Sequence, residues 1–260
     1  MSATIALRMV GADLLKLRKK LGTVIWSLVL ALGPVLIFFI VRAAQHGSNP
    51  AEHGPAGGVD GFMDSMRILA VLFGPLAAIM IGAEGGAGDV ASGVFRDLVV
   101  TGRSRLALFL TRVPAAIAVT WLVTLAGFAL VLAGTFAFAG GAETPTAAEL
   151  ANGLAFSLFS TAVICIVAVG FAALTSSRPA ALTVLIGWHL VASPLLGSIG
   201  SLGSSRKLIL DQAINHYSPV RLGDHNANVT MGGATATVVV LAWLAIFLAL
   251  GAWRTRTMDA

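Results

Sequence analysis

Hydrophobic residues form six long stretches of this chain that contain no charged side chain, and the charges gather in the segments between them. The first stretch, Leu21–Val41, directly follows a basic cluster of Lys16, Arg18, Lys19 and Lys20. A helix needs about 20 mostly apolar residues to cross a bilayer core about 30 Å thick. The pattern therefore predicts an all-α polytopic membrane protein with six transmembrane helices.

The predicted spans cover residues 21–42, 64–86, 112–140, 150–176, 179–202 and 233–253. The second uncharged stretch, Ile68–Ala83, is too short to cross the core, so its helix is expected to continue past Arg67 or Glu84. The first stretch is too long for the apolar region of a signal peptide and no A-x-A site follows it, so we expect it to be retained. Two connections between the predicted spans are distinctive. Residues 87–108 form a charged connection, and residues 203–232 form a long loop with an apolar patch around Leu210 and Ile214.

Residues 1–20 carry an amphipathic pattern. Leu7, Val10, Leu14, Leu17 and Leu21 recur at helical spacing on one side, and the lysines lie mostly elsewhere. This pattern is typical of a helix that lies at the membrane interface. The alternative is a solvated basic tail before the first span.

Lysine and arginine give the chain an orientation, because cytoplasmic loops carry an excess of them. With the N-terminus inside, six crossings return the C-terminus inside. The residues then facing the cytoplasm are Arg8, Lys16, Arg18, Lys19, Lys20, Arg96, Arg103, Arg105, Arg112, Arg178, Arg254 and Arg256. Those facing outward are Arg42, Arg67, Arg206, Lys207 and Arg221. The larger inside set predicts that both termini are cytoplasmic.

Composition agrees with a membrane protein, since 57% of the residues are hydrophobic and 11% are charged. The net charge of +5 is explained by the topology, so no nucleic-acid partner is expected. Cys165 is the one cysteine, which excludes an intramolecular disulfide and a cysteine zinc site.

Catalytic motifs are incomplete or absent. Residues 86–89 match the G-x-G-D string of intramembrane aspartyl proteases, but such enzymes need a second aspartate, normally in a Tyr-Asp pair. The one tyrosine, Tyr217, precedes Ser218, and no predicted span interior contains an aspartate. No Gly-Lys pair occurs, so the chain has no P-loop for ATP. We therefore expect no enzyme activity, no cofactor and no metal site in this chain.

Polar groups inside membrane spans commonly mark a transport path. His189 lies near the middle of the fifth uncharged stretch. It could face a cavity, bind substrate or carry a proton, or it could be hydrogen-bonded between helices; without a carboxylate partner it would be a poor proton relay. Pro34, Pro75 and Pro194 also fall within spans, where each frees a backbone carbonyl and permits a kink. These four residues are the candidate transport-pathway residues.

The segment after the second span carries the most specific motif. Glu84 stands at the exit of the span, glycines follow at 88 and 93, and Val94-Phe95-Arg96-Asp97-Leu98 leads to Thr101-Gly102-Arg103-Ser104-Arg105. Gly82 and Gly86 add a G-x-x-x-G pair. Together with the order of the elements, this motif resembles the ABC-2 type transporter permeases, many of which have proline where this chain has Gly102.

The resemblance implies a membrane-spanning permease subunit of an ATP-binding cassette exporter in the bacterial plasma membrane. Two permeases, identical or related, would form the pore, and two separate ATPase subunits would bind ATP and Mg²⁺. A coupling helix between spans two and three would contact the ATPase. Its candidate coupling residues are Glu84, Val94, Phe95, Arg96, Asp97, Leu98, Arg103 and Arg105. The path would run along spans one, two and five, and its apolar lining indicates a hydrophobic or amphipathic cargo such as a drug, antibiotic or lipid. The alternative is a membrane anchor or assembly subunit that transports nothing.

Overall fold

The computed structural model describes residues 3–100, 102, 104–219 and 229–258. Within these residues it contains six helices that are long and apolar enough to cross a membrane, which confirms the predicted all-α class. Their bounds are α2 (Leu21–Ser48), α3–η1–α4 (Gly58–Ala91), α6 (Arg105–Ala137), α7 (Ala147–Thr175), α8–η2–α9 (Arg178–Ser198) and α11 (Gly233–Thr257). The second span continues past both Arg67 and Glu84, as its short uncharged stretch requires.

Two of these spans are interrupted by a π-helical segment. The second consists of α3 (Gly58–Met66), η1 (Arg67–Phe73) and α4 (Gly74–Ala91). The fifth consists of α8 (Arg178–Gly187), η2 (Trp188–Ala192) and α9 (Ser193–Ser198). The shorter elements are α1 (Ala3–Lys19), α5 (Val94–Val100), η3 (Gly200–Leu208, a 3-10 helix) and α10 (Leu210–Asn215).

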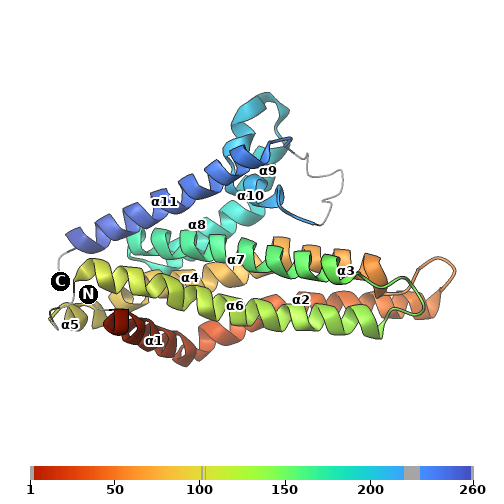
Figure 1. Cartoon of the computed structure of the whole chain (residues 1–260), viewed down its shortest axis with the longest axis horizontal. Coiled ribbons are helices and arrows are strands. Elements are labelled where there is room, and N and C mark those ends of the chain that lie inside the picture. The colour runs from red at the N-terminus through yellow and green to blue at the C-terminus, as the bar shows by residue number, and fades with distance from the viewer. Residues whose placement is uncertain (1–2, 101, 103, 220–228, 259–260) are drawn as a thin grey trace.

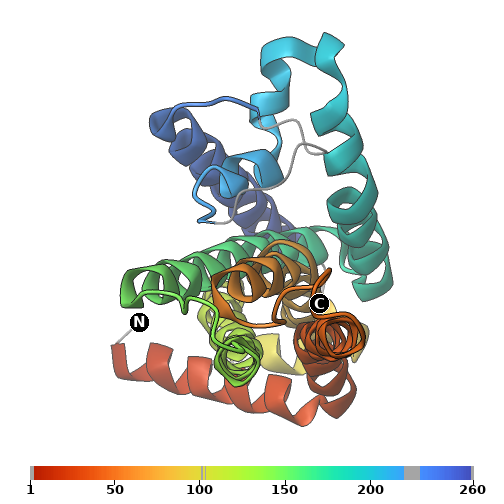
Figure 2. The same cartoon turned by 90° about the vertical axis from the view of Figure 1, so that its right-hand side faces the viewer.

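Four spans form the main bundle, and two stand on one side of it. In Figure 1 the helices α2, α4, α6 and α7 run alongside one another, and Figure 2 shows α8, α9 and α11 rising away from them. The most apolar window is 67% buried in the second span and 61% buried in the fourth, but 22% in the fifth and 17% in the sixth. The second and fourth spans are therefore the centre of the molecule, and the fifth and sixth leave most of their surface for lipid or another chain.

Helix α1 lies across the long helices at the end of the bundle that also holds α5 and the last turns of α11 (Figures 1 and 2). We call this the α5 end. Leu17 is buried, and Val10 and Leu14 pack against the core, whereas Leu7 and Leu21 are exposed. The predicted apolar stripe thus packs α1 onto the protein along its middle and C-terminal part.

The most extensive contact between spans is that of α4 and α7, and it depends on glycine. A Cβ atom added to Gly82 would lie 2.6 Å from Ala168 Cβ, and one added to Gly86 would lie 2.3 Å from the carbonyl oxygen of Val169. Small residues at this spacing let two helix backbones approach closely, which is how spans associate in a bilayer. The G-x-x-x-G pair of the sequence therefore lies at the central helix contact.

Hydroxyl side chains set where several helices begin. Ser104 accepts a hydrogen bond from the Ala107 N–H at 3.1 Å and starts α6, and Thr146 and Glu149 form a capping box at the start of α7. Helix α6, which is the third span, consequently begins at Arg105, ahead of its predicted start at residue 112. It ends at Ala137, where Gly140 and Gly141 follow with positive φ angles of 53° and 88°.

Candidate functional site

Glu84 joins three helices at the α5 end. One of its oxygens lies 3.0 Å from an Arg178 nitrogen and accepts a hydrogen bond from Thr23 Oγ1 at 3.4 Å. The other lies 3.4 Å from Lys20 Nζ. Arg178 also donates to Thr23 Oγ1 at 3.1 Å. The Glu84 side chain is 4% exposed, so it holds the beginnings of α2 and α8 against α4 and presents no surface to another subunit.

Asp89 forms the second ionic junction, five residues further along α4. It lies 3.2 Å from Lys16 Nζ and 3.0 Å from an Arg112 nitrogen. Asp13 shares Lys16 at 3.2 Å and accepts a hydrogen bond from Thr111 at 2.9 Å. Asp89 is thus paired with two cations, Lys16 of α1 and Arg112 of α6, whereas an aspartyl protease dyad pairs one aspartate with another. This junction fixes α1 to α4 and α6.

The short helix α5 connects the second and third spans, between two glycines with positive φ: Gly93 at 74° and Gly102 at 77°. Proline is restricted to φ near −65°, so the Gly102 turn cannot be the one formed where the resembling permeases carry proline. Phe95 is buried, and the Arg112 guanidinium lies 5.6 Å from the centre of its ring.

The remaining predicted coupling residues divide between surface and interior. Val94, Arg96 and Asp97 are exposed, and Leu98 is half-buried. Val100, which was not among the predicted residues, is also exposed. Phe95, a predicted coupling residue, is therefore directed inward, and the outward face of α5 carries both apolar and charged side chains. Arg105 donates to the backbone carbonyls of Arg256 and Met258, which ties the start of α6 to the end of α11. Arg103 lies outside the described residues.

His189 lies where the second and fifth spans meet the loop that precedes α11. Its Nδ1 is 2.8 Å from Asp211 Oδ1, and its Nε2 is 3.1 Å from the carbonyl oxygen of Val71. The side chains of His189 and Asp211 are 9% and 13% exposed. The sequence-based premise that His189 has no carboxylate partner was therefore wrong, because α10 folds back and places Asp211 against the fifth span.

Pro75 explains why the carbonyl oxygen of Val71 can accept the hydrogen bond from His189. Pro75 has no N–H to donate to the carbonyl four residues earlier, which is that of Val71. Each π-helical segment stands just before such a proline: the Gly74 N–H bonds the Leu69 carbonyl, and the Ser193 N–H before Pro194 bonds the Trp188 carbonyl. Such π-helical turns are frequent at functional sites.

Three of the four predicted pathway residues thus come together. His189, Pro75 and Pro194 line a cavity of about 110 Å³ with Asp211, Ser160 and Gln212. Pro34 does not line it and stays within the unbroken helix α2.

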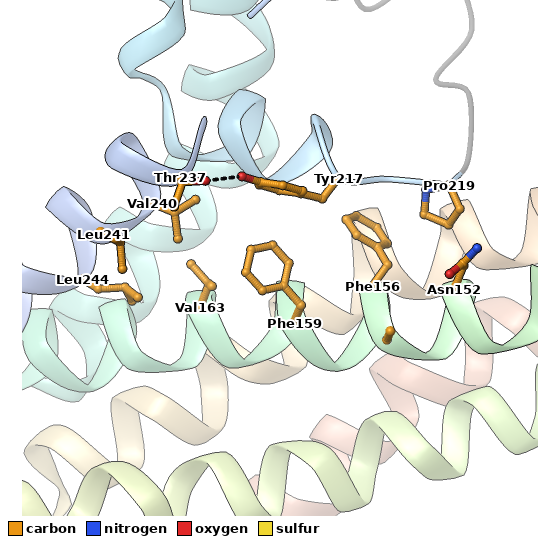
Figure 3. Close-up of a pocket in the computed structure, with 11 residues that line it drawn as sticks. Asn152, Phe156, Phe159, Val163, Tyr217, Pro219, Thr237, Val240, Leu241 and Leu244 are labelled. Carbon is orange, nitrogen blue, oxygen red and sulfur yellow. Dashed lines mark hydrogen bonds between the residues drawn. The ribbon is translucent and has the colours of Figure 1, made fainter. Parts of the chain in front are cut away.

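A larger apolar cavity of about 540 Å³ lies between α7 and α11. Figure 3 shows Val163 of α7 near Val240 and Leu244 of α11, and Phe156 and Phe159 of α7 pointing toward the segment of Tyr217 and Pro219. Tyr217 closes one side through a 2.6 Å hydrogen bond between its hydroxyl group and Thr237 Oγ1. Its size suits a drug-sized or lipid-like molecule, but it lies between the fourth and sixth spans, whereas the predicted path follows spans one, two and five.

Comparison with known proteins identified no relative of this chain. The chain matches no protein-family model and has no significant match among curated proteins. The six apolar helices place it among multi-pass membrane proteins.

Proposed function

We propose that this protein is the membrane-spanning permease subunit of an ATP-binding cassette transporter, an exporter driven by a separate ATPase subunit. The observation that carries the proposal is α5, a short helix between the second and third spans whose outward face presents Arg96 and Asp97 while Phe95 fixes it to the bundle. Such a helix offers charges that set register against a partner and a rigid attachment that transmits movement.

In this proposal, the contacts around α5 would transmit a movement of this helix to the spans. A displacement of α5 would act on Arg112 of α6 through the Phe95 ring, and Arg112 is bonded to Asp89 of α4. Lys16 of α1 pairs with the same Asp89, so a displacement of α4 would also act on α1. Closure of the ATPase pair would therefore move α1, α4 and α6 together as a rigid body, the kind of transition that switches access to a pore.

The surroundings of the spans suit a second permease and a hydrophobic cargo. The exposed apolar residues of α2 and α11 include Trp26, Ile37, Leu241 and Trp253. In a bilayer these face lipid or a second permease copy. The cavity of about 540 Å³ would accept a hydrophobic or amphipathic molecule such as a drug, antibiotic or lipid. ATP and Mg²⁺ would be bound by the partner, in a bacterial plasma membrane with the α5 end in the cytoplasm.

The test is retention of an ATPase by the tagged protein, purified from membranes of its own source. ATPase activity and a polypeptide with a Walker A sequence should copurify. Arg96→Glu and Val100→Asp change exposed residues of α5, and each should lower the retained ATPase activity about tenfold, because they place a repulsive or desolvated charge in the interface.

Lys207→Glu is the control, since it reverses a charge in η3, away from α5, and should leave retention unchanged. Phe95→Ala should instead lower the thermal stability of the purified chain, because Phe95 is buried. Full retention in both α5 variants would contradict the coupling role. An intact membrane complex without any ATPase would favour the anchor or assembly subunit.

A further inference from the structure

The hydrogen-bonding atoms around His189 determine how many protons the site holds. The Val71 carbonyl oxygen can only accept, so His189 Nε2 must carry the hydrogen of the 3.1 Å bond. The 2.8 Å contact of Nδ1 with Asp211 Oδ1 needs a hydrogen of its own, placed on either atom. Both bonds therefore exist together only when the imidazole and the carboxyl group share two protons.

Loss of one of these protons removes one of the bonds. A neutral imidazole beside an ionised Asp211 has a single N–H. If that hydrogen lies on Nε2, the Nδ1 lone pair faces the carboxylate; if it lies on Nδ1, the Nε2 lone pair faces the Val71 oxygen. Each arrangement leaves a repulsive contact in a site where both side chains are nearly buried, and an unmade bond there is costly.

No second charged group offsets this effect among the described residues that line the two cavities adjoining His189. From α7 the neighbours are Ser160 and Ile164, from α9 Ser193, and from α10 Gln212 and Asn215. The lining residues that η1 and α11 contribute are uncharged, and Arg67, the charged residue of η1, lines neither cavity. Asp211 is thus the titratable partner of His189 in this part of the structure.

We propose that His189 and Asp211 form a proton-binding clamp that fixes α10 to the second and fifth spans. With the proton bound, His189 bridges Val71 of η1 and Asp211 of α10. When the proton leaves for solvent, α10 separates from η1 and the cavity of about 110 Å³ opens. Trp243 donates its indole N–H to the Leu208 carbonyl at 2.9 Å, so the segment stays attached just ahead of α10. This site acts whether or not an ATPase partner is present.

The clamp is tested by amide hydrogen exchange of the full chain in lipid nanodiscs, read on the peptide covering residues 209–216. Rates are compared with those of the same peptide in the unfolded chain at each pH. From about pH 5 to about pH 8, the range in which histidine normally changes charge, protection in the wild type should fall about tenfold as the proton is lost.

Asp211→Asn is the decisive variant. The introduced amide can donate to Nδ1 while Nε2–H still donates to Val71, so a neutral imidazole makes both bonds. Protection should then remain high and show no pH dependence. Asp211→Ala should lose protection about tenfold at every pH. His216→Gln, an exposed histidine next to α10, is the matched control and should behave as the wild type.

Two results would overturn the clamp. One is wild-type protection that does not change across this pH range. The other is an equal pH dependence in the wild type and Asp211→Asn, which would assign the titration to another group. Because the first measurement uses the unmodified protein, a variant that fails to fold leaves the proposal open to refutation.

Discussion

Replacing Gly86 by alanine is expected to lower the free energy of unfolding by about 2–3 kcal/mol, because it forces apart the central pair of spans. The added Cβ would lie 2.3 Å from the Val169 carbonyl oxygen, 2.8 Å from Ala172 Cβ and 3.0 Å from the Ala173 nitrogen. Backbone atoms cannot rotate away, so α4 and α7 must separate along their length. In a thermal melt of the purified protein the midpoint should fall by roughly 4 to 12 °C.

Gly22→Ala is the matched control, because Gly22 also lies in a spanning helix but has no atom within 4 Å of an added Cβ. Alanine is the better helix former by about 1 kcal/mol, so this variant should be as stable as the wild type or more stable. Equal losses in the two variants would show that close approach at Gly86 is not the cause. A tolerated Gly86→Ala would mean that close backbone approach at Gly86 is not required for the pairing of α4 and α7.

The number and class of the helices could be predicted from the sequence because a bilayer leaves few alternatives. Backbone groups in hydrocarbon must be satisfied within the segment, so an uncharged stretch of sufficient length becomes a helix. The ends of the helices could not be read in the same way. Arg112 bounded an uncharged stretch and so marked the start of a predicted span, yet it lies inside α6, paired with Asp89 of another helix.

In the candidate site, His189 could be identified from the sequence, but its partner Asp211 could not. His189 stood out because it is polar within an apolar stretch, but Asp211 lies 22 residues later in a loop and carries no such signal. What could have indicated it is the apolar pattern of Leu210 and Ile214, both buried, which brings α10 back against the spans. The apolar pattern could thus indicate that the segment around Leu210 packs on the spans, but only the fold shows that the Asp211 side chain points toward His189.

The coupling segment illustrates the limit for short helices. In seven residues, Val94–Val100 offers too few turns for periodicity to define a buried face. The sequence therefore grouped Phe95 with the exposed coupling residues, whereas its ring is buried beside the guanidinium of Arg112, which lies after α5 in the chain. Glu84 was placed among the coupling residues by the resemblance to ABC-2 permeases, whereas its buried side chain pairs with Arg178 at the start of a distant span.

Glu84→Gln is expected to cost about 2–3 kcal/mol of stability by removing the charge that joins three helices. The buried hydrogen bond with the Thr23 hydroxyl and the ion pair with Arg178, whose side chain is 35% exposed, carry most of this effect. Lys20 is 52% exposed at its side chain and contributes less, because solvent screens that pair. The measurement is a denaturant or thermal unfolding curve, with Glu52→Gln, an exposed glutamate in the loop after α2, expected to change stability by less than about 0.5 kcal/mol.

A double-mutant cycle separates the ion pair from a general loss of packing. Arg178→Gln alone should also destabilise, because it leaves the Glu84 carboxylate buried beside a more distant lysine. Residues in one ionic network are not independent, so the double variant should be less unstable than the sum of the single changes by about 1 kcal/mol or more. Additive losses would show that Glu84 and Arg178 do not act through each other. The α5 end would then owe its arrangement to Asp89 and its two cations, which join α1, α4 and α6 but not α8, and to the packing of the helices.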